Sequence, residues 1–566
     1  MPPPPLPTPA TAAAGAPTPR PAWNTNRNLV VTHPLLSLLE SCASFRRLLQ
    51  LQALLTVSGL AAERFPASRL LAFCALSDPP RLAHAEALLA RAAAPPGPNA
   101  YMLATMMRAY LRAGLPRRAL ALFRRVLRDR LPADARTLVF AIKSAAAASS
   151  PGGAVHCVAL KRGFLHQSVL VGNALVHLYA SGARLRDARK EVFDGMAVKD
   201  VYSWTSMVGA YAKCGDLDSA ARMFEDMPTR NVVSWSCMIA GYSQANQPEE
   251  AVRMFNDMVA AGVEPIDATL VSVLSACAQL GCLDLGRWIY DKYIVSNKVR
   301  LTVNLGNAFI DMFAKCGDVG GAARLFGDME ERNLVSWNSM ITALAAHGQS
   351  EAALHIFQQF KGTGIVPDEI TYTGVLSACS HSGLVQGGRY HFKEMKNVYG
   401  IEPRAEHYAC LIDLLGKVGL LDEAFEVASS MPKGADEAGW GALLNACRMH
   451  GNIEIAECAA DKLVGLDPSD SGIYVLMSQI YASKSKWDQV RMLRTIMRER
   501  GVKKNPGRSS IEVDGKFQEF LVADVSHVRS EDIYAALKNI YLHSKSEELC
   551  HVEQIMGKGS VRIVEG

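Results

Sequence analysis

The chain has 566 residues and a mass of 61.3 kDa, with 49% apolar and 20% charged residues. This composition excludes wholesale disorder and is typical of a globular protein. The formal net charge of +5 permits an anionic partner without requiring one. Thirteen cysteines occur without any CxxC pair, which argues against a zinc ribbon or a disulfide framework. No apolar run reaches the length of a membrane-spanning helix, so we expect no membrane association.

The first 32 residues differ in composition from the rest. Residues 1–27 are rich in Pro, Ala and Thr, and no acidic residue precedes Glu40. Such a stretch cannot bury enough apolar surface to offset its ordering entropy. An absence of acids is typical of organelle transit peptides, and the alternative is a Pro- and Ala-rich tail without a targeting role. We therefore predict a disordered transit peptide over 1–32, for plastid or mitochondrion, which the sequence does not distinguish.

Three different words recur at one spacing. SWSCM at 234–238 returns as SWNSM at 336–340, AKCGD at 212–216 returns at 314–318, and LSAC at 274–277 returns at 376–379, each after 102 residues. This period divides into units of 31, 35 and 36 residues, at 201–231, 232–266 and 267–302. Self-similarity of this kind indicates a tandem array of stacked supersecondary units.

Each unit contains two helical patterns. In 201–231 the apolar residues of the first pattern are Tyr202, Trp204, Met207, Val208 and Tyr211, and a second apolar stripe runs over 217–227 to Pro228. An Ala-x-x-x-Phe step recurs in the second pattern, as in Ala220 with Phe224. The small residue lets the helices approach closely, and the aromatic ring can pack against the next hairpin. Because one hairpin cannot bury its stripe alone, we predict an all-α, right-handed α-solenoid of helix–turn–helix units.

Helix hairpins of this length occur in peptide-binding tetratricopeptide repeats and in pentatricopeptide repeats. The alternating unit lengths, the VVSWSCM opening (232–238), the AYAKCGD turn (210–216) and the closings GVEP (262–265) and GIVPD (364–368) resemble the PLS class of plant pentatricopeptide-repeat (PPR) proteins. The resemblance covers about residues 33–545 and implies a PLS-type repeat array over 33–436.

The resemblance implies binding of single-stranded RNA, with about one base read per repeat. In this family the fifth and last residues of P- and S-type repeats read the base. The corresponding pairs are Asn173 with Asp200, Thr205 with Asn231, Asn307 with Asn333, and Asn338 with Asp368. Ser236 is paired with the apolar Ile266, and Ala104 with Asp134, which leaves these repeats incomplete. By the family's rules the pairs predict a core of U-A-N-N-Y-U, read 5′ to 3′.

Each of these polar residues has an alternative role as an ordinary helix cap or turn residue. Asp134, Asp200 and Asp368 lie at repeat junctions, where caps belong. Taken singly, a cap is favoured; taken together, the recurrence beside Trp204 and Trp337 favours base recognition. Phosphate contacts are expected from scattered Lys and Arg rather than from a dense patch.

The C-terminal region begins with WGALLNACRMHGN at 440–452. It continues with LDPSDSGIYVLMSQIYASKSKWDQV at 466–490 and VKKNPGRSSIEVDGKFQEFLV at 502–522. These segments resemble the E1 and E2 modules (437–505) and the E+ motif with its tail (506–566) of organellar RNA-editing factors. From the residues alone, 437–500 continues as helix hairpins. Ile511–Val513 and Phe517–Val522 flank Asp514-Gly515, a hairpin-turn pair, and 530–545 is predicted to be an amphipathic helix.

Many relatives of this class end in a DYW cytidine deaminase, which needs HxE and a later CxxC to hold zinc. His551-Val552-Glu553 matches HxE, but no cysteine follows Cys550, and the residues before Gly566 leave no room for such a domain. We interpret both residues as surface residues and expect no catalytic residue, metal, cofactor or small-molecule substrate.

The sequence therefore predicts a non-enzymatic site-recognition factor for C-to-U editing of organellar transcripts. Its expected partners are single-stranded organellar RNA and, in trans, a DYW-type deaminase with other editing factors. The alternatives are an organellar splicing or stability factor and a protein-binding helical scaffold.

Overall fold

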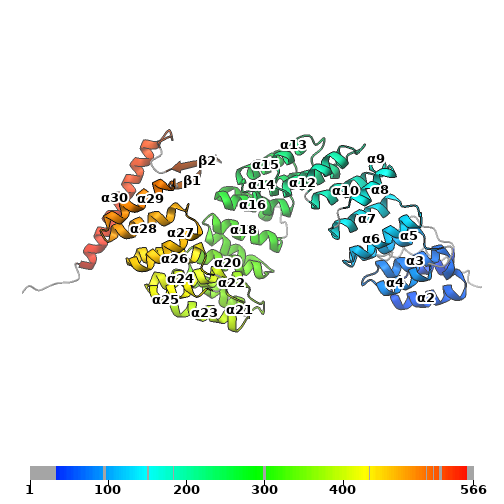
Figure 1. Cartoon of the computed structure of the whole chain (residues 1–566), viewed down its shortest axis with the longest axis horizontal. Coiled ribbons are helices and arrows are strands. Elements are labelled where there is room, and N and C mark those ends of the chain that lie inside the picture. The colour runs from blue at the N-terminus through cyan, green and yellow to red at the C-terminus, as the bar shows by residue number, and fades with distance from the viewer. Residues whose placement is uncertain are drawn as a thin grey trace, which may run out of the picture. The chain divides into compact units, whose positions relative to one another are not determined.

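The computed structural model describes residues 33–556, except 93–96, 150–151, 183, 297–300, 432–433, 505–506, 514–515 and 522–524. Helices dominate this part of the chain, with one two-stranded hairpin near its end (Figure 1). The predicted transit peptide lies outside the described residues. The chain divides into two compact units, Met1–Thr269 and Leu270–Gly566, called here the N-terminal and C-terminal units.

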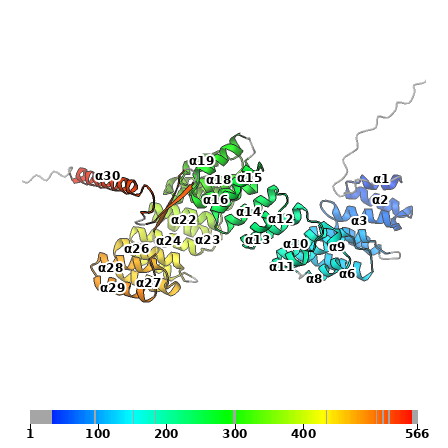
Figure 2. The same ribbon diagram turned by 90° about the horizontal axis from the view of Figure 1, so that it is seen from above.

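Helices alternate between two layers within each unit. The first helix of each hairpin contacts the first helices of its neighbours, as α10 contacts α7 and α12, and these helices form the first-helix layer. The second helices form the second-helix layer. Neighbouring hairpins follow in chain order in both views (Figure 1 and Figure 2). The predicted α-solenoid of helix–turn–helix units is therefore confirmed.

In the N-terminal unit the first helices are α1 (Pro34–Glu40), α3 (Arg64–Leu76), α5 (Ala100–Arg112), α7 (Ala135–Ala147), α10 (Val169–Ser181), α12 (Val201–Lys213) and α14 (Val232–Gln244). The second helices are α2 (Phe45–Val57) with η1 (Leu60–Ala62), α4 (Leu82–Arg91), α6 (Pro116–Arg128), α8 (Gly153–Lys161) with α9 (Phe164–Gln167), α11 (Leu185–Asp187) with η2 (Ala188–Phe193), α13 (Leu217–Glu225) and α15 (Pro248–Ala260).

The helix α16 (Asp267–Leu280) crosses the boundary between the units. The following first helices are α18 (Val303–Lys315), α20 (Leu334–Ala346), α22 (Glu369–Ser382), α24 (Ala405–Val418), α26 (Glu437–His450) and α28 (Ser471–Ser483). The second helices are α17 (Leu283–Ile289) with η3 (Tyr290–Ser296), α19 (Val319–Asp328), α21 (Ser350–Lys361), α23 (Val385–Asn397), α25 (Leu421–Ser429), α27 (Ile453–Leu466) and α29 (Trp487–Glu499).

The recurring AKCGD word encodes the turn between the two helices of a repeat. Gly215 has a φ of 79°, a left-handed conformation that favours glycine and ends the first helix. Asp216 then caps the second helix, since its Oδ1 accepts a hydrogen bond from the backbone N–H of Ser219 at 3.1 Å. Gly317 and Asp318 repeat this geometry 102 residues later.

Aromatic side chains join consecutive repeats. The Phe224 ring of α13 meets the Trp235 ring of α14 edge to face, with 4.7 Å between the ring centroids, and Phe326 meets Trp337 at 5.0 Å. Edge-to-face pairs of this kind add stabilisation beyond the burial of their apolar area. The predicted packing of the Ala-x-x-x-Phe aromatic against the next hairpin is confirmed.

The C-terminal hairpin and helix follow the predicted order. Strands β1 (Arg508–Val513) and β2 (Lys516–Leu521) pair antiparallel, with Val513 opposite Lys516; the Asp514-Gly515 turn and Val522 lie outside the described residues. The helix α30 (Ser530–Met556) is longer than the predicted 530–545. Its apolar residues Leu537 and Ile540 are 54% and 66% exposed, so these two side chains face largely toward solvent.

Candidate nucleic-acid interface

The predicted base-reading residues recur at one place in the first-helix layer. Asn173, Thr205, Ser236, Asn307 and Asn338 are each the fifth residue of a first helix. The last residue of each repeat directly precedes the next first helix, which makes it the N-cap residue in four of the five pairs: Asp200, Asn231, Asn333 and Asp368. The fold therefore brings two residues about thirty positions apart to one point on the first-helix layer.

The two Asn–Asp pairs have the same geometry. Asn173 Nδ2 donates to Asp200 Oδ1 at 3.1 Å, and Asn338 Nδ2 donates to Asp368 Oδ1 at 2.9 Å. Because a carboxylate only accepts, the amide nitrogen must face it. Asn173 Oδ1 accepts from the Ser203 hydroxyl at 2.6 Å. This network fixes the amide while leaving it a second N–H and a second oxygen lone pair, which can bond a group that carries both an acceptor and a donor.

The Asp200 carboxyl is held in its ionised form. Burial alone would raise its pKa, but hydrogen bonds from Ser203 and Asn173 outweigh burial and hold the pKa below the usual range of an aspartate. The ionised carboxylate keeps the facing Asn173 amide in one orientation at neutral pH.

Asn307 and Asn333 form a weaker version of this pair. Asn307 Nδ2 donates to Asn333 Oδ1 at 3.2 Å. Asn307 is only 8% exposed, and its Oδ1 has no hydrogen-bond partner among the described residues. A buried acceptor without a partner costs roughly 1–3 kcal/mol. A ligand that donates a hydrogen bond to this oxygen would remove that cost.

Thr205 and Ser236 use their hydroxyl protons locally. Thr205 Oγ1 donates to the Val201 carbonyl at 2.7 Å and lies 3.5 Å from Asn231 Oδ1. A hydroxyl has one proton, so the closer carbonyl takes it and Thr205 presents lone pairs. Ser236 Oγ lies 2.5 Å from Thr269 Oγ1, whereas Ile266 is 44% exposed and makes no such contact. Thr269, three residues after Ile266, is the polar partner that the sequence analysis missed.

The cap interpretation and the recognition interpretation describe the same atoms. Asp200, Asn231, Asn333 and Asp368 each accept a hydrogen bond from the backbone N–H of the third residue of the next first helix, within a capping box. Asp134 caps α7 in the same way through Thr137. The cap fixes the position of these residues, and four of them also contact the fifth residue of the preceding first helix.

Trp204 and Trp337 do not lie beside these pairs as open aromatic faces. Trp337 is 6% exposed and packs between Phe326 and Phe360, while Trp204 packs against Phe193. Their role is to join consecutive repeats. The sequence analysis counted these two rings in favour of base recognition; the structure shows that both pack between consecutive repeats, and the base-reading role of the pairs beside them stays a prediction.

Exposed apolar side chains accompany the polar pairs instead, at the second residue of the first helices. Their exposed fractions run from 43% to 71%, and the residues are Tyr101, Leu170, Tyr202, Val233, Val335 and Ile370. The second and fifth residues of a helix are neighbours on one face. The sequence analysis counted Tyr202 in the apolar pattern of its helix, whereas the structure leaves this residue 71% exposed; the signal that was missed is an apolar residue at the same place in repeat after repeat.

A lysine recurs at the thirteenth residue of three first helices. Lys213, Lys315 and Lys417 are exposed and lie 102 residues apart. Residues two and thirteen of a helix lie on nearly the same face, because eleven residues make about three turns. These lysines therefore lie on the side of the exposed apolar residues and could contact phosphate.

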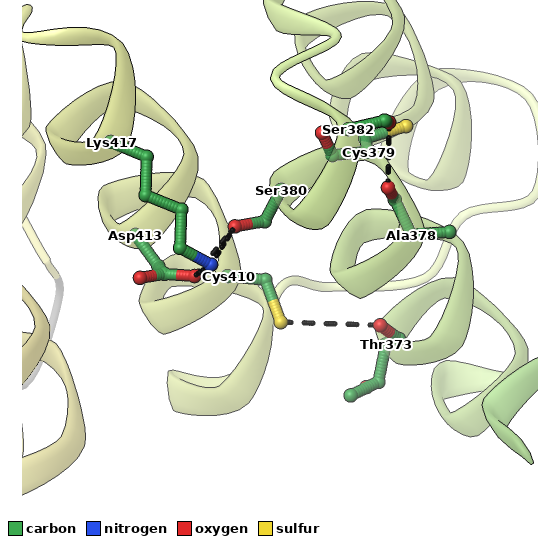
Figure 3. A network of polar contacts seen from close by, with 8 residues as sticks. All are labelled: Thr373, Ala378, Cys379, Ser380, Ser382, Cys410, Asp413 and Lys417. Atoms are coloured by element: carbon green, nitrogen blue, oxygen red, sulfur yellow. Dashed lines mark hydrogen bonds and ion pairs between the residues drawn. The ribbon is translucent and has the colours of Figure 1, made fainter. Parts of the chain in front are cut away.

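Two of these lysines are neutralised by an aspartate one turn earlier. Lys315 Nζ lies 2.9 Å from Asp311 Oδ2. Lys417 Nζ lies 2.6 Å from Asp413 Oδ2, which also accepts from the Ser380 hydroxyl at 2.5 Å, as Figure 3 shows. Four residues before Lys213, where the other two helices have an aspartate, this helix has Gly209. Lys213 therefore has no ion-pair partner among the described residues. Lys213 therefore carries the most available positive charge of the three.

Other kinds of site were also sought in the described residues. In that part of the chain, His, Cys, Asp and Glu form no group of three that could hold a metal ion. Over the same residues, every helix is too short or too polar to cross a bilayer. The side chains of His551 and Glu553 lie outside the described ones.

Family models match this chain in several places. The PPR repeat model matches residues 101–131, 202–232, 307–334, 370–398 and 406–433. The PPR repeat family model matches 230–279 and 332–381, and the E motif model matches 450–512.

Known proteins match most of the chain. A mitochondrial pentatricopeptide repeat-containing protein of Arabidopsis thaliana is 34% identical over 93% of this chain and 92% of its own length. A chloroplastic one from the same plant is 35% identical over 76% of this chain and 55% of its own. The crystal structure of the maize pentatricopeptide repeat protein PPR10 superposes with a TM-score of 0.51 at 18% identity, over 82% of this chain and 78% of that one. PPR10 has also been solved in complex with an 18-nt psaJ RNA element, and that structure matches with a TM-score of 0.50.

The names of these relatives include both organelles that the sequence predicted. Together with the helix hairpins, the repeated turn word and matched relatives above 30% identity over nearly the whole length, they establish that the chain belongs to the pentatricopeptide repeat family and carries an E motif.

Proposed function

We propose that this protein binds single-stranded RNA in a plastid or mitochondrion and reads its bases with the first-helix layer. The observation that carries the proposal is the recurring contact between the fifth residue of one first helix and the N-cap of the next. Exposed apolar residues at the second position flank the Asn173–Asp200 and Asn338–Asp368 contacts on both sides and the Asn307–Asn333 contact on one side, at Val335. Apolar side chains of this kind can pack against the faces of unstacked bases. The structural neighbour PPR10, solved in complex with an 18-nt psaJ RNA element, supports RNA as the ligand class.

Each pair offers hydrogen bonds that fit one kind of base edge. The remaining N–H and oxygen lone pair of Asn173 or Asn338 match uracil, which presents a carbonyl oxygen beside the N3–H donor. The buried Asn307 Oδ1 needs a donor, which uracil N3–H or cytosine N4–H supplies. Thr205 has given its proton to Val201 and can accept from the adenine N6 amino group. These matches support the preference for U-A-N-N-Y-U.

Within RNA biology we propose a site-recognition role in C-to-U editing, with catalysis supplied in trans by a DYW-type deaminase and other editing factors. The E motif at 450–512 supports this assignment. We further propose that 1–32 is the transit peptide, 33–436 the PLS array, 437–505 the E1/E2 modules and 506–566 the E+ motif with its tail. The protein binds its target and does not itself perform chemistry.

Comparison of organellar cDNA with organellar DNA in plants lacking this protein tests the role. Loss of C-to-U conversion at one or a few sites, downstream of a U-A-N-N-Y-U match, is the expected result. Full editing at every site with altered introns or transcript ends would instead identify a splicing or stability factor. Full editing with an unchanged transcript pattern, together with RNA binding that does not depend on salt, would identify a protein-binding scaffold.

A further inference from the structure

The second-helix layer of the N-terminal unit gathers positive charge opposite the base-reading layer. Over residues 100–193, sixteen Lys and Arg stand against four Asp and Glu. Twelve of the sixteen lie on the second helices or the turns at their ends: Arg117, Arg118, Arg124, Arg125, Arg128, Arg130, Lys161, Arg162, Arg184, Arg186, Arg189 and Lys190. We call these twelve residues the basic surface. The basic residues of this unit are thus more concentrated than the scattered Lys and Arg from which phosphate contacts were expected.

The helix α6 forms the most regular part of the basic surface. Its buried residues Ala119, Phe123 and Val126 pack into the array. Arg117, Arg124 and Arg128 are exposed and follow one another at intervals of seven and four residues, which places them on one stripe of the helix. The stripe extends about 16 Å at 1.5 Å per residue. Arginine side chains therefore line the solvent side of α6 over nearly its whole length.

Only part of this charge is neutralised within the protein. Arg118 pairs with Glu86 at 2.9 Å, and Asp129 is shared by Arg125 at 3.3 Å and Arg128 at 3.2 Å. Arg117 and Arg124 have no ion-pair or hydrogen-bond partner in the described part of the chain. The unneutralised guanidinium groups thus sit at one end and in the middle of the stripe.

The basic surface ends at the next repeat. In α13, Asp218 and Glu225 outnumber Arg222, and in α15, Glu249, Glu250 and Asp257 outnumber Arg253. Positive charge is therefore not a general property of second helices in this protein. Within the N-terminal unit it is concentrated on the neighbouring hairpins that carry α6, α8 and η2, and a separate basic set, Arg491, Arg494 and Arg498, lies on α29 of the C-terminal unit.

The chemistry of the basic surface fits phosphodiesters. Ten of its twelve residues are Arg, whose planar fork donates two parallel hydrogen bonds to a phosphate group. A helix that binds a membrane surface would also present large apolar side chains for insertion, whereas on α6 the apolar residues Phe123 and Val126 are buried in the array. Phosphates without lipid tails are the better match.

We propose that the basic surface binds the sugar–phosphate backbone of RNA outside the stretch whose bases are read. The inference rests on the proposed function for the presence of RNA. The target would then be held twice, by its bases on the first-helix layer and by flanking phosphates, independent of sequence, on the second-helix layer. The flanking contact increases affinity without contributing to site selection.

Binding of the full chain to two RNAs tests the inference: the U-A-N-N-Y-U core alone, and the core extended by unrelated flanks. The test variant is Arg117→Glu with Arg124→Glu, and the matched control is Arg222→Glu with Arg253→Glu, which makes the same change of charge on α13 and α15 of the same layer. We expect flanks to tighten binding at least tenfold in the unaltered protein and in the control. The test variant should lose this gain, keep its affinity for the core, and show a log–log salt slope smaller by about 1.4 on the extended RNA.

The inference would be overturned if the flanks tightened binding in the test variant as much as in the unaltered protein. It would also be overturned if the test variant lost the same affinity for the core RNA as for the extended RNA. Binding to phosphatidylglycerol vesicles that depends on Arg117 and Arg124, while RNA binding does not, would overturn it as well. A flanked RNA with a scrambled core separates the two proposals. If the flanks increase affinity through Arg117 and Arg124 but the protein does not prefer the intact core over the scrambled one, the basic surface is supported and base reading is contradicted. If the protein prefers the intact core but the flanks do not increase affinity, base reading is supported and the basic surface is contradicted.

Discussion

At the scale of single residues, Asn333 combines an N-cap with the contact to Asn307 that we propose for base recognition. Its Oδ1 accepts from the Ser336 backbone N–H at 3.0 Å and from Asn307 Nδ2 at 3.2 Å. Asp is as good an N-cap as Asn, whereas Ala costs about 1 kcal/mol. The two functions of this side chain can therefore be separated by substitution.

We predict that Asn333→Asp leaves the free energy of unfolding unchanged and converts the pair into the Asn–Asp arrangement of Asn173 and Asn338. The RNA base preferred opposite this pair should change from either pyrimidine to uridine alone. Asn333→Ala should lower the free energy of unfolding by about 1 kcal/mol and remove the preference. Denaturant unfolding and competition between U- and C-containing RNAs measure both effects; unchanged discrimination in Asn333→Asp would contradict the base-reading role.

Replacing the fifth residue of the following repeat tests the next pair, Asn338 with Asp368. By the family's rules, Asn338→Thr should shift the preference opposite Asp368 from uridine toward guanine, since a hydroxyl replaces the amide. Ser339→Thr, one residue along the same helix, is the matched control and should change nothing. A binding competition between RNAs that differ at this one base is the measurement, and unaltered selectivity would refute the assignment at this repeat.

Lys213 and Lys417 should contribute unequally to phosphate binding, because Asp413 neutralises Lys417. Lys213→Ala should reduce the log–log salt slope of RNA binding by about 0.7, the value for one phosphate contact on a single strand. Lys417→Ala should change it less, and Asp413→Asn should tighten RNA binding by releasing the Lys417 charge. Equal effects of the two lysine substitutions would show that the ion pair does not control this contact.

At the scale of secondary-structure elements, a buried polar network joins α21, α22 and α23. Glu394 accepts from Lys361 Nζ at 2.6 Å and from the Tyr372 hydroxyl at 3.2 Å, and its Oε2 lies 3.0 Å from His391 Nδ1. Burial lowers the pKa of His391, although Glu394 opposes this. Burial would raise the pKa of Glu394, but Lys361 and His391 outweigh it and hold that pKa below the usual range.

These two shifts make the packing of the three helices sensitive to acid. Both groups bind protons more readily in the unfolded chain, so stability increases with pH. The contribution of His391 is complete above its unfolded pKa near 6.5 and decreases as the pH falls through that value; the contribution of Glu394 decreases below about 4.5. Hydrogen exchange, corrected for intrinsic rates, should show faster local opening of α21–α23 at pH 5.5 than at pH 7.5.

Glu394→Gln keeps the shape of the side chain and removes its charge. Local stability at pH 7.5 should fall by about 2 kcal/mol, the usual magnitude for hydrogen bonds to a charged group, and the decrease below pH 4.5 should disappear. Hydrogen exchange over α5–α7, whose residues do not contact this network, serves as the control. If stability still decreased below pH 4.5 in Glu394→Gln, that decrease would have to come from another group.

At the scale of the whole molecule, stability is passed between neighbouring repeats. Trp337 bridges Phe326 of the preceding repeat and Phe360 of its own, and solenoid repeats contact only their neighbours. Trp337→Ala should therefore cost about 3–5 kcal/mol locally and raise hydrogen exchange over α19–α21. Protection of α5–α7 should be unaffected, and a loss of protection throughout the chain would instead indicate one cooperative unit.

The repeat period, the helix hairpins and the polar pairs followed from the sequence alone. The 102-residue offset, the Gly215-Asp216 turn and the caps at Asp200 and Asp368 are local features, and local patterns determine where helices begin and end. The spacing of a repeat then determines that its fifth residue meets the next cap. The choice of Asn173 and Asn338 themselves came from the resemblance to pentatricopeptide repeats, which assigns base reading to the fifth and last residues of a repeat.

Only the tertiary structure decided how each side chain is used. Asn307 Oδ1 lacks a partner, Thr269 replaces Ile266, Asp413 neutralises Lys417, and Trp337 is buried between repeats. The basic surface likewise exists because arginines from separate hairpins share one layer. Each of these outcomes depends on contacts between residues far apart in the chain, and such contacts are set by how the repeats pack rather than by the periodicity of the sequence.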